Sequence, residues 1–196
     1  NKLLISPRPQ LLREAWELGI TAVVLPEFDR AMDTPQNVPE HFCTVGEHTL
    51  RALELVEAAP VLRWTMLLHD LAKPQVRTTG LGGIDYFPHH QEKGEQLAVE
   101  VLRRLRFDNE TVRRVRLLVR WHDVILEPQA EAVRRAVSQL GRELFPLYLQ
   151  VRRADILAQR PLRRQEKLSE LARVEEIFAQ ILERGDCLAV KELAVN

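Results

Sequence analysis

The most constraining feature of the sequence is a segment at residues 61–72 that is apolar on almost every face. A helix without a polar face is normally buried, so we predict that this segment forms the central helix of the fold. The segment ends in His69-Asp70, where burial of an unpartnered carboxylate is unfavourable. An arginine, another cation or a metal ion would compensate the charge of Asp70, and a plain buried His-Asp hydrogen bond is the simpler alternative.

Helical patterns separated by short turns make up most of the remaining sequence. Residues 29–42 are polar and turn-rich and are predicted to form a loop, and the glycine-containing residues 75–88 are predicted to form a long loop or a small hairpin. No sustained strand alternation is present, so the predicted fold class is all-α. The other predicted helices span 8–18, 45–58, 90–105, 109–122, 128–139, 142–159 and 162–184, the last of them ending before Gly185.

The composition excludes several classes of protein. With 196 residues, of which 45% are hydrophobic and 29% charged, the chain can form one domain with a sizeable core and is not expected to be disordered or fibrous. No apolar run approaches the roughly 20 residues that a membrane span needs, so no membrane partner is expected. Two cysteines, Cys43 and Cys187, cannot build a disulfide framework. They indicate reduced thiols in a cytoplasm, with a single bridge as the alternative.

The charge balance bears on nucleic-acid binding. The net charge is zero, with 28 basic and 28 acidic side chains, which excludes a uniformly basic nucleic-acid binder. Arginines nevertheless occur in clusters, and their planar groups of donors suit phosphate. Solvated helix faces on which each Arg pairs with a neighbouring Glu are the plainer interpretation. The candidates for contact with nucleic acid are Arg103, Arg104, Arg113, Arg114, Arg152 and Arg153.

Histidines and aspartates supply the candidates for a metal site. Neighbouring side chains at the end of a helix, such as His69 and Asp70, can converge on one ion and offer it an imidazole nitrogen and a carboxylate oxygen. Such ligands suit Mn, Fe, Zn or Ni, or Mg with more oxygen ligands. His90 competes with its neighbour His89 for a ligand role, and His122 also suits a plain position at a helix end. The candidate ligands from other segments are His48, His90, His122 and Asp155.

The order of these residues resembles the HD superfamily of metal-dependent phosphohydrolases. The family pattern is a His, a His-Asp pair, two further His in the two-metal members, and a distant Asp. Here the pattern is filled, in order, by His48, His69-Asp70, His90, His122 and Asp155. The usual His-Asp-x-Gly-Lys string carries Ala72 in place of Gly. The resemblance implies an HD-domain helical bundle, with a short N-terminal helical extension, that binds one or two divalent metal ions.

The flanking strings narrow the resemblance to the HD-bearing part of bacterial CCA-adding tRNA nucleotidyltransferases. Residues 4–9, 25–29 and 36–41 are similar to the stretch before the HD region, and residues 153–159 and 187–196 to the stretch after it. Glu40 stands where related sequences often have a second His. The nucleotidyltransferase head, with its Gly-Ser and Asp-x-Asp motifs, is not visible, so a fragment or a stand-alone relative is expected and nucleotide addition is not.

The resemblance also implies an organisation in three parts and two classes of function. The parts are an N-terminal helical segment and loop at 1–40, an HD metal-binding domain at 41–160, and a charged helix and tail at 161–196. The first function is hydrolysis of a phosphorylated nucleotide or RNA end, with Asp70 as the shared ligand and Lys73 neutralising a phosphate oxygen. Lys73 also suits a plain role as a cation at a helix C-terminus. The second function is a non-hydrolytic helical body that binds tRNA, and a metal-free scaffold is a third, plainer interpretation.

Overall fold

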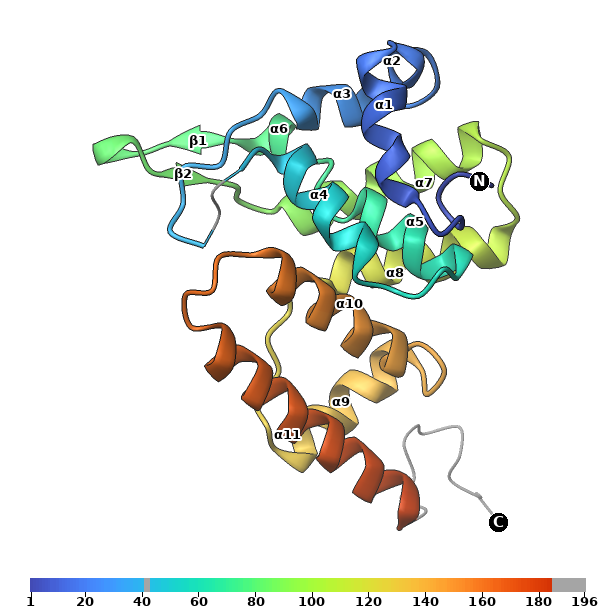
Figure 1. Cartoon of the computed structure of the whole chain (residues 1–196). Coiled ribbons are helices and arrows are strands. Elements are labelled where there is room, and N and C mark those ends of the chain that lie inside the picture. The colour runs from blue at the N-terminus through green and yellow to red at the C-terminus, as the bar shows by residue number, and fades with distance from the viewer. Residues whose placement is uncertain (41–42, 185–196) are drawn as a thin grey trace.

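The computed structural model describes residues 1–40 and 43–184 and confirms the all-α fold class (Figure 1). The helices before the hairpin are η1 (Pro9–Leu11), α1 (Leu12–Glu17), α2 (Ile20–Val24), α3 (Pro26–Met32), α4 (Val45–Glu54), α5 (Pro60–Leu68) and α6 (Lys73–Val76). The hairpin consists of β1 (Thr78–Thr79), η2 (Leu81–Gly83) and β2 (Asp85–Tyr86). It is followed by α7 (His90–Arg104), α8 (Asn109–Trp121), α9 (Ala130–Leu140), α10 (Phe145–Ala158) and α11 (Arg164–Glu183).

Helix α5 is the central helix, as its apolar character predicts. Every side chain from Leu62 to Leu68 is buried, and α5 packs against α4, α7, α8 and α10. The helix begins at Pro60, whose fixed φ suits the first turn of a helix. It ends at Leu68 rather than at residue 72, because the chain then makes tight turns in which the amide of Lys73 bonds to the carbonyl of Asp70. These turns bury two neighbouring polar side chains, those of His69 and Asp70, at the end of α5.

Two hydrophobic clusters share α8 and α10. The first cluster joins α1, α3, α4, α5, α7 and α8 with one side of α10. The second joins α9, α10 and α11 with Leu118 of α8. In Figure 1 the helices of the second cluster lie below those of the first, and the hairpin projects to the left. Helices α8 and α10 therefore join the two clusters. One buried polar residue of the site below belongs to each of them: His122 directly follows α8, and Asp155 lies on α10.

The predicted loop at 29–42 is wrong for residues 29–32, which belong to α3. Proline at the first position starts this helix, and Phe28, Ala31 and Met32 bury its apolar face. The predicted helix at 45–58 is too long, because α4 ends at Glu54. The small hairpin predicted as one option for 75–88 is present, with Thr78 paired to Tyr86. Gly185, Cys187 and the predicted tail to residue 196 lie outside the described residues.

Gly46 sets the distance between α3 and α4. A Cβ atom built at Gly46 would lie 2.8 Å from Cα of Met32, closer than real contacts allow. The absent side chain thus lets α4 approach the backbone of α3. His48 follows two residues later, so this close approach also fixes the depth at which its imidazole enters the core.

Asp85 ties the hairpin to the segment before α4. Its carboxylate accepts hydrogen bonds from the backbone amide of Asn37 at 2.9 Å and from Thr79 Oγ1 at 2.7 Å, and pairs with Arg77 Nε at 3.0 Å. Burial opposes ionisation of Asp85, but the ion pair with Arg77 and the hydrogen bonds outweigh it and lower the pKa of Asp85 to about 2. The tie fixes one wall of the cavity described below.

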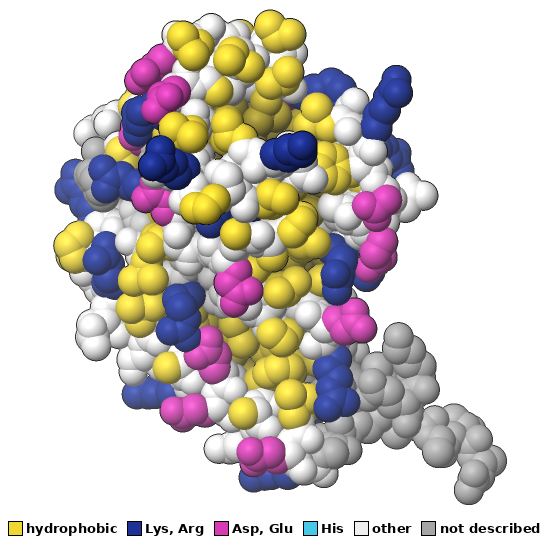
Figure 2. All heavy atoms as spheres, turned by 45° about the vertical axis from the view of Figure 1, so that its right-hand side comes forward, with side chains coloured by type: hydrophobic (Ala, Val, Ile, Leu, Met, Phe, Trp, Pro, Cys, Tyr) yellow, Lys and Arg dark blue, Asp and Glu magenta, His cyan; other side chains and the backbone are white. Residues whose placement is uncertain are grey.

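Hydrophobic side chains are exposed on the N-terminal helices, at the top of the face shown in Figure 2. About half or more of the side-chain surface is exposed at four positions: Leu18, Ile20, Val23 and Val24. An apolar cavity of about 750 Å³ lies between these helices and the α7–α8 turn. No helix in the described residues is both long and apolar enough to cross a membrane. The division into parts at 1–40, 41–160 and 161–196 stays a prediction.

Candidate metal centre

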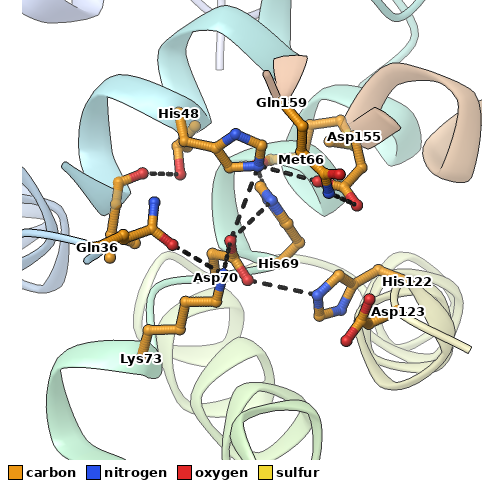
Figure 3. A network of polar contacts seen from close by, with 12 residues as sticks. Gln36, His48, Met66, His69, Asp70, Lys73, His122, Asp123, Asp155 and Gln159 are labelled. Carbon is orange, nitrogen blue, oxygen red and sulfur yellow. Dashed lines mark hydrogen bonds and ion pairs between the residues drawn. The ribbon is translucent and has the colours of Figure 1, made fainter. Parts of the chain in front are cut away.

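The structure brings together all six residues that were predicted as metal ligands. His48 comes from α4, His69 and Asp70 from the turn after α5, and Asp155 from α10, as Figure 3 shows from close by. The remaining two are His90, the first residue of α7, and His122, which follows α8. All six are buried. They form two groups, in each of which the candidate ligand atoms lie within 4.8 Å of one another: His48, His69 and Asp155, and Asp70, His90 and His122.

Asp70 belongs to the second group but also faces the histidines of the first, and it turns one carboxylate oxygen toward each pair of histidines. Its Oδ2 is 3.4 Å from Nε2 of His69 and 3.8 Å from Nε2 of His48. Its Oδ1 is 3.4 Å from Nε2 of His122 and 3.7 Å from Nε2 of His90. A carboxylate can bind an ion through each oxygen, whereas an imidazole cannot, so Asp70 is the residue that suits a shared ligand.

Backbone carbonyls hold three of the four imidazoles in one orientation. Nδ1 of His69 bonds to the carbonyl of Met66 at 2.7 Å, Nδ1 of His90 to that of Phe87 at 3.0 Å, and Nδ1 of His122 to that of Val119 at 2.7 Å. Because a carbonyl only accepts, each Nδ1 carries the proton, and in the neutral ring Nε2 then has a free electron pair. The same arrangement orients histidines that bind metals.

The convergence of these electron pairs fits a cation. Nε2 of His90 and Nε2 of His122 are 3.3 Å apart, and both face the carboxylate of Asp70. Nε2 of His69 and Oδ1 of Asp70 are buried and have no hydrogen-bond partner within the part of the chain that the structure describes. Ligands about 2.0–2.2 Å from a tetrahedral ion are about 3.3–3.6 Å from each other, close to several of these separations. The donor set of imidazole nitrogen and carboxylate oxygen suits Zn, Mn, Fe or Ni.

Asp155 joins the first group through two hydrogen bonds. Nε2 of His48 lies 2.9 Å from its Oδ1, and the side-chain amide of Gln159 donates to its Oδ2 at 3.1 Å (Figure 3). Gln159, the residue directly after α10, accepts a hydrogen bond from Lys167 Nζ at 2.9 Å. Burial opposes ionisation of Asp155, but the hydrogen bond and charge of His48 outweigh it, so the pKa of Asp155 is lowered.

Lys73 supplies a positive charge at the centre of the site. Its Nζ lies 2.7 Å from Oδ2 of Asp70 and donates to Oε1 of Gln36 at 3.0 Å. Burial raises the pKa of Asp70, but the charges of Lys73 and His69 outweigh burial and hold that pKa well below its usual range. Burial lowers the pKa of His69, yet the Asp70 carboxylate outweighs it and the net pKa is raised; for His90 burial prevails and lowers the pKa.

A cavity of about 370 Å³ opens onto these groups. Lys73, His90 and His122 line it, together with the carboxylates of Asp70 and Asp155. The rest of the lining comes from other segments: Val38, Glu40, Asp85, Tyr86, Phe87, Asp123, Gln159 and Lys167. His89 does not take part, since its side chain is 82% exposed. A small polar molecule that enters this cavity therefore meets Asp70, Asp155 and two of the four histidines, His90 and His122, directly.

The six candidate arginines for nucleic-acid contact are spread over several surfaces. Arg152 is buried and donates to the backbone carbonyl of His122 at 2.9 Å, so it helps to fix the position of His122. Arg103 is exposed on α7. The other four form ion pairs: Arg104 with Glu27, Arg113 with Glu110, Arg114 with Glu110 and Glu143, and Arg153 with Glu175. Their role in binding nucleic acid stays a prediction.

Three residues of the site were not predicted from the sequence. Gln36 lies in a string that carries the resemblance, which is a signal that could have indicated it. Gln159 lies four residues after Asp155, a spacing that puts both on one face of a helix. Lys167 lies on the charged helix α11, and no local pattern distinguishes it from other charged residues there.

Comparison with known proteins agrees with this geometry. A model of the HD domain family matches residues 40–184. The chain is 34% identical to a CC-adding tRNA nucleotidyltransferase of Thermus thermophilus, over 98% of this chain and 45% of that protein. It is also 34% identical to an A-adding tRNA nucleotidyltransferase of Deinococcus radiodurans, over 98% of this chain and 44% of that protein. A multifunctional CCA protein of Alkalilimnicola ehrlichii is 39% identical over 62% of this chain and 30% of that protein.

The chain thus spans less than half the length of these curated relatives. The family model covers α4 to α11 and includes all six of the converging residues. With that match over most of its length, and with the His and Asp residues gathered at one cavity, the chain belongs to the HD domain family.

Proposed function

We propose that this chain is a metal-dependent phosphohydrolase of the HD type, acting on phosphomonoesters or cyclic phosphodiesters of nucleotides or RNA ends. The observation that carries the proposal is the position of Asp70 between two groups of side chains. Three of the four imidazoles are aimed at it by backbone carbonyls, and the cavity gives access to Asp70, His90, His122 and Asp155.

The proposed ligands follow the two observed groups. His48, His69 and Asp155 would hold one divalent ion, and His90 and His122 a second, with Asp70 shared. When bound, such ions polarise a phosphoryl oxygen and lower the pKa of water toward neutrality. The metal is Mn, Fe, Zn, Ni or Mg in this proposal, and the donor set with four imidazoles favours the transition metals over Mg.

Lys73 is the proposed catalytic cation. Its ammonium is paired with Asp70, donates to Gln36 and lies 5.3 Å from the centre of the Phe87 ring, so a phosphate oxygen in the cavity would take the third hydrogen on the side of that ring. Because the ammonium lies beside the carboxylate that is shared between the groups, it neutralises a non-bridging oxygen where negative charge gathers during phosphoryl transfer. Gln36 fixes the side chain in this position.

The relatives give the proposal its biological setting. They are named as enzymes that act on tRNA, so we propose a tRNA-processing context, with the end of an RNA or a nucleotide released from it as the substrate. A cytoplasmic location is part of the same proposal. Nucleotide addition is not proposed for this chain, because it matches less than half of each relative.

The alternative, a non-hydrolytic body that binds tRNA, has less support. Four of the six arginines on which it rests are already paired with glutamates, and each would have to exchange its partner for a phosphate. It also gives no reason for four imidazoles to converge on one carboxylate inside a cavity.

Hydrolysis assays on purified protein test the proposal. The protein is supplied with each candidate metal in turn and is assayed with adenosine 3′-phosphate and with adenosine 2′,3′-cyclic phosphate. We expect release of phosphate or opening of the cyclic ester with at least one metal, and loss of that activity on addition of a chelator and in Asp70→Asn. Full activity of Asp70→Asn, or no turnover with any metal while the protein is folded, would overturn the proposal.

A further inference from the structure

Lys167 is a cation of the cavity without a carboxylate partner. It lies in the first turn of α11, is half-buried, and lines the same cavity as Asp70, His90 and His122. Its Nζ donates to Oε1 of Gln159 at 2.9 Å, and it forms no ion pair with any residue in 1–40 or 43–184. An ammonium has three hydrogens, so two are left for another acceptor.

The neighbouring cations differ from Lys167 in this respect. Lys73 is paired with Asp70 at 2.7 Å, and Arg152 lies 3.5 Å from both Asp123 and Asp155. Lys167 is therefore the cavity-lining lysine that has no ion-pair partner in residues 1–40 and 43–184, although the charge of its chain neighbour Glu166 interacts with it. A partly dehydrated ammonium without an ion-pair partner attracts an anionic group more strongly than one that is already paired.

A second feature is the place of Lys167 relative to the candidate metal centre. Gln159 accepts from Lys167 and donates to Oδ2 of Asp155 at 3.1 Å. One side-chain amide thus separates the Lys167 ammonium from the carboxylate of a proposed ligand. The cavity is therefore lined by two lysines on different elements, Lys73 beside Asp70 and Lys167 on α11.

We propose that Lys167 binds a second phosphate of the substrate, one that is not hydrolysed, so that the site prefers nucleotides with two phosphates to nucleotides with one. The inference rests on the proposed function, and it narrows the substrate class of that site. The reaction itself is unchanged: water attacks phosphorus, the ester bond of the first phosphate breaks, and the nucleoside hydroxyl leaves with a proton. The second phosphate contributes binding energy only.

This second phosphate has two possible sources, and three substrates distinguish them. Adenosine 3′-phosphate has one phosphate, adenosine 3′,5′-bisphosphate adds a terminal phosphate, and the dinucleotide ApAp adds an internucleotide phosphate. We expect kcat/KM of the metal-loaded protein to be about tenfold higher for at least one of the latter two, the size expected for a hydrogen-bonded charge pair. The substrate with the higher kcat/KM identifies the second phosphate as the terminal or the internucleotide one.

Variants at residue 167 test the assignment. Lys167→Met should bring the ratio of kcat/KM values close to one, and Lys167→Arg should keep most of the preference. Lys93→Met, which removes an exposed lysine of α7 outside the cavity, should leave the ratio as in the wild type. If Lys167 only positions Gln159, Lys167→Met will lower kcat/KM for all three substrates by the same factor. An unchanged ratio in Lys167→Met would overturn the inference.

Product binding separates this inference from the proposed function. Calorimetry compares adenosine 5′-phosphate, the product that keeps the second phosphate, with adenosine. Wild type should bind the phosphorylated product about tenfold more tightly, and Lys167→Met should lose that difference. If this result is obtained without any hydrolysis, the hydrolase proposal fails and the role of Lys167 stands. If hydrolysis occurs and Lys167→Met keeps the difference in product affinity, only the inference on Lys167 fails.

Discussion

His90 and His122 come from different helices, yet their Nε2 atoms lie 3.3 Å apart. Each ring is held by a hydrogen bond from Nδ1 to the carbonyl of the residue three positions earlier. In the neutral rings two electron pairs therefore face each other beside a carboxylate, an arrangement that repels unless a cation lies between the groups. This relationship supports the proposed metal centre, whereas the His69-Asp70 pair alone would be satisfied by a plain buried hydrogen bond.

Replacing Lys73 by Met should lower kcat about a hundredfold, because one donor to the charged phosphate oxygen is lost. The metal content should stay as in the wild type, since no ligand is removed, and elemental analysis checks this. Lys93→Met, which lies outside the cavity, should keep wild-type kcat. A kcat of Lys73→Met equal to that of the wild type would reduce Lys73 to a structural cation at a turn.

Gly46→Ala should lower the free energy of unfolding by about 1–3 kcal/mol, the usual range for an overpacked contact. The added Cβ meets the backbone of Met32, which cannot move aside as a flexible side chain can. Urea unfolding of the variant measures the effect. Glu54→Ala, an exposed change on the same helix, is the control and should stay within about 0.5 kcal/mol of the wild type.

Asp85→Asn should lower stability at neutral pH by about 2 kcal/mol, because a charged acceptor of several donors is lost. The pKa of Asp85 is about 2 in the folded protein, below the ordinary value, so its contribution is present above about pH 4. It is lost as the pH falls from about 4 to about 2. Unfolding of both proteins across this range should show their stabilities converging; a constant difference would contradict the account.

Tyr148→Phe should lower stability by about 1 kcal/mol, because the carbonyl of Val124 loses the hydroxyl that donates to it at 2.7 Å. Burial raises the pKa of Tyr148 to about 12. A raised pKa means that folding favours the protonated hydroxyl, so this contribution is present below about pH 10 and is lost toward pH 12. Ultraviolet titration should find a tyrosine ionising near pH 12 in the wild type and not in Tyr148→Phe.

The sequence predicted the central helix for a local physical reason, because residues 61–72 have no polar face. The six candidate ligands were predicted from their order along the chain, which the HD pattern supplies. Their convergence depends on how α4, α5, α7, α8 and α10 pack, and no local pattern contains that.

What the sequence did not indicate depends on contacts between distant segments. Residues 29–32 looked polar and loop-like, but Ala31 and Met32 become helical by packing against the core. Lys167 becomes part of the site because the side chain of Gln159, directly after α10, accepts its hydrogen bond. Such differences arise from tertiary packing, and the sequence shows them only when a family pattern records them.

The most direct test of the account is the metal stoichiometry of purified protein, compared with that of Asp70→Asn and His122→Asn. The account predicts one or two transition-metal ions per wild-type chain by elemental analysis, a marked loss in Asp70→Asn, which removes the carboxylate shared by both groups, and at least partial loss in His122→Asn. Circular dichroism confirms that each variant is folded. A folded wild-type chain that takes up no metal at saturating concentrations, or an Asp70→Asn chain that retains all of it, would contradict the account.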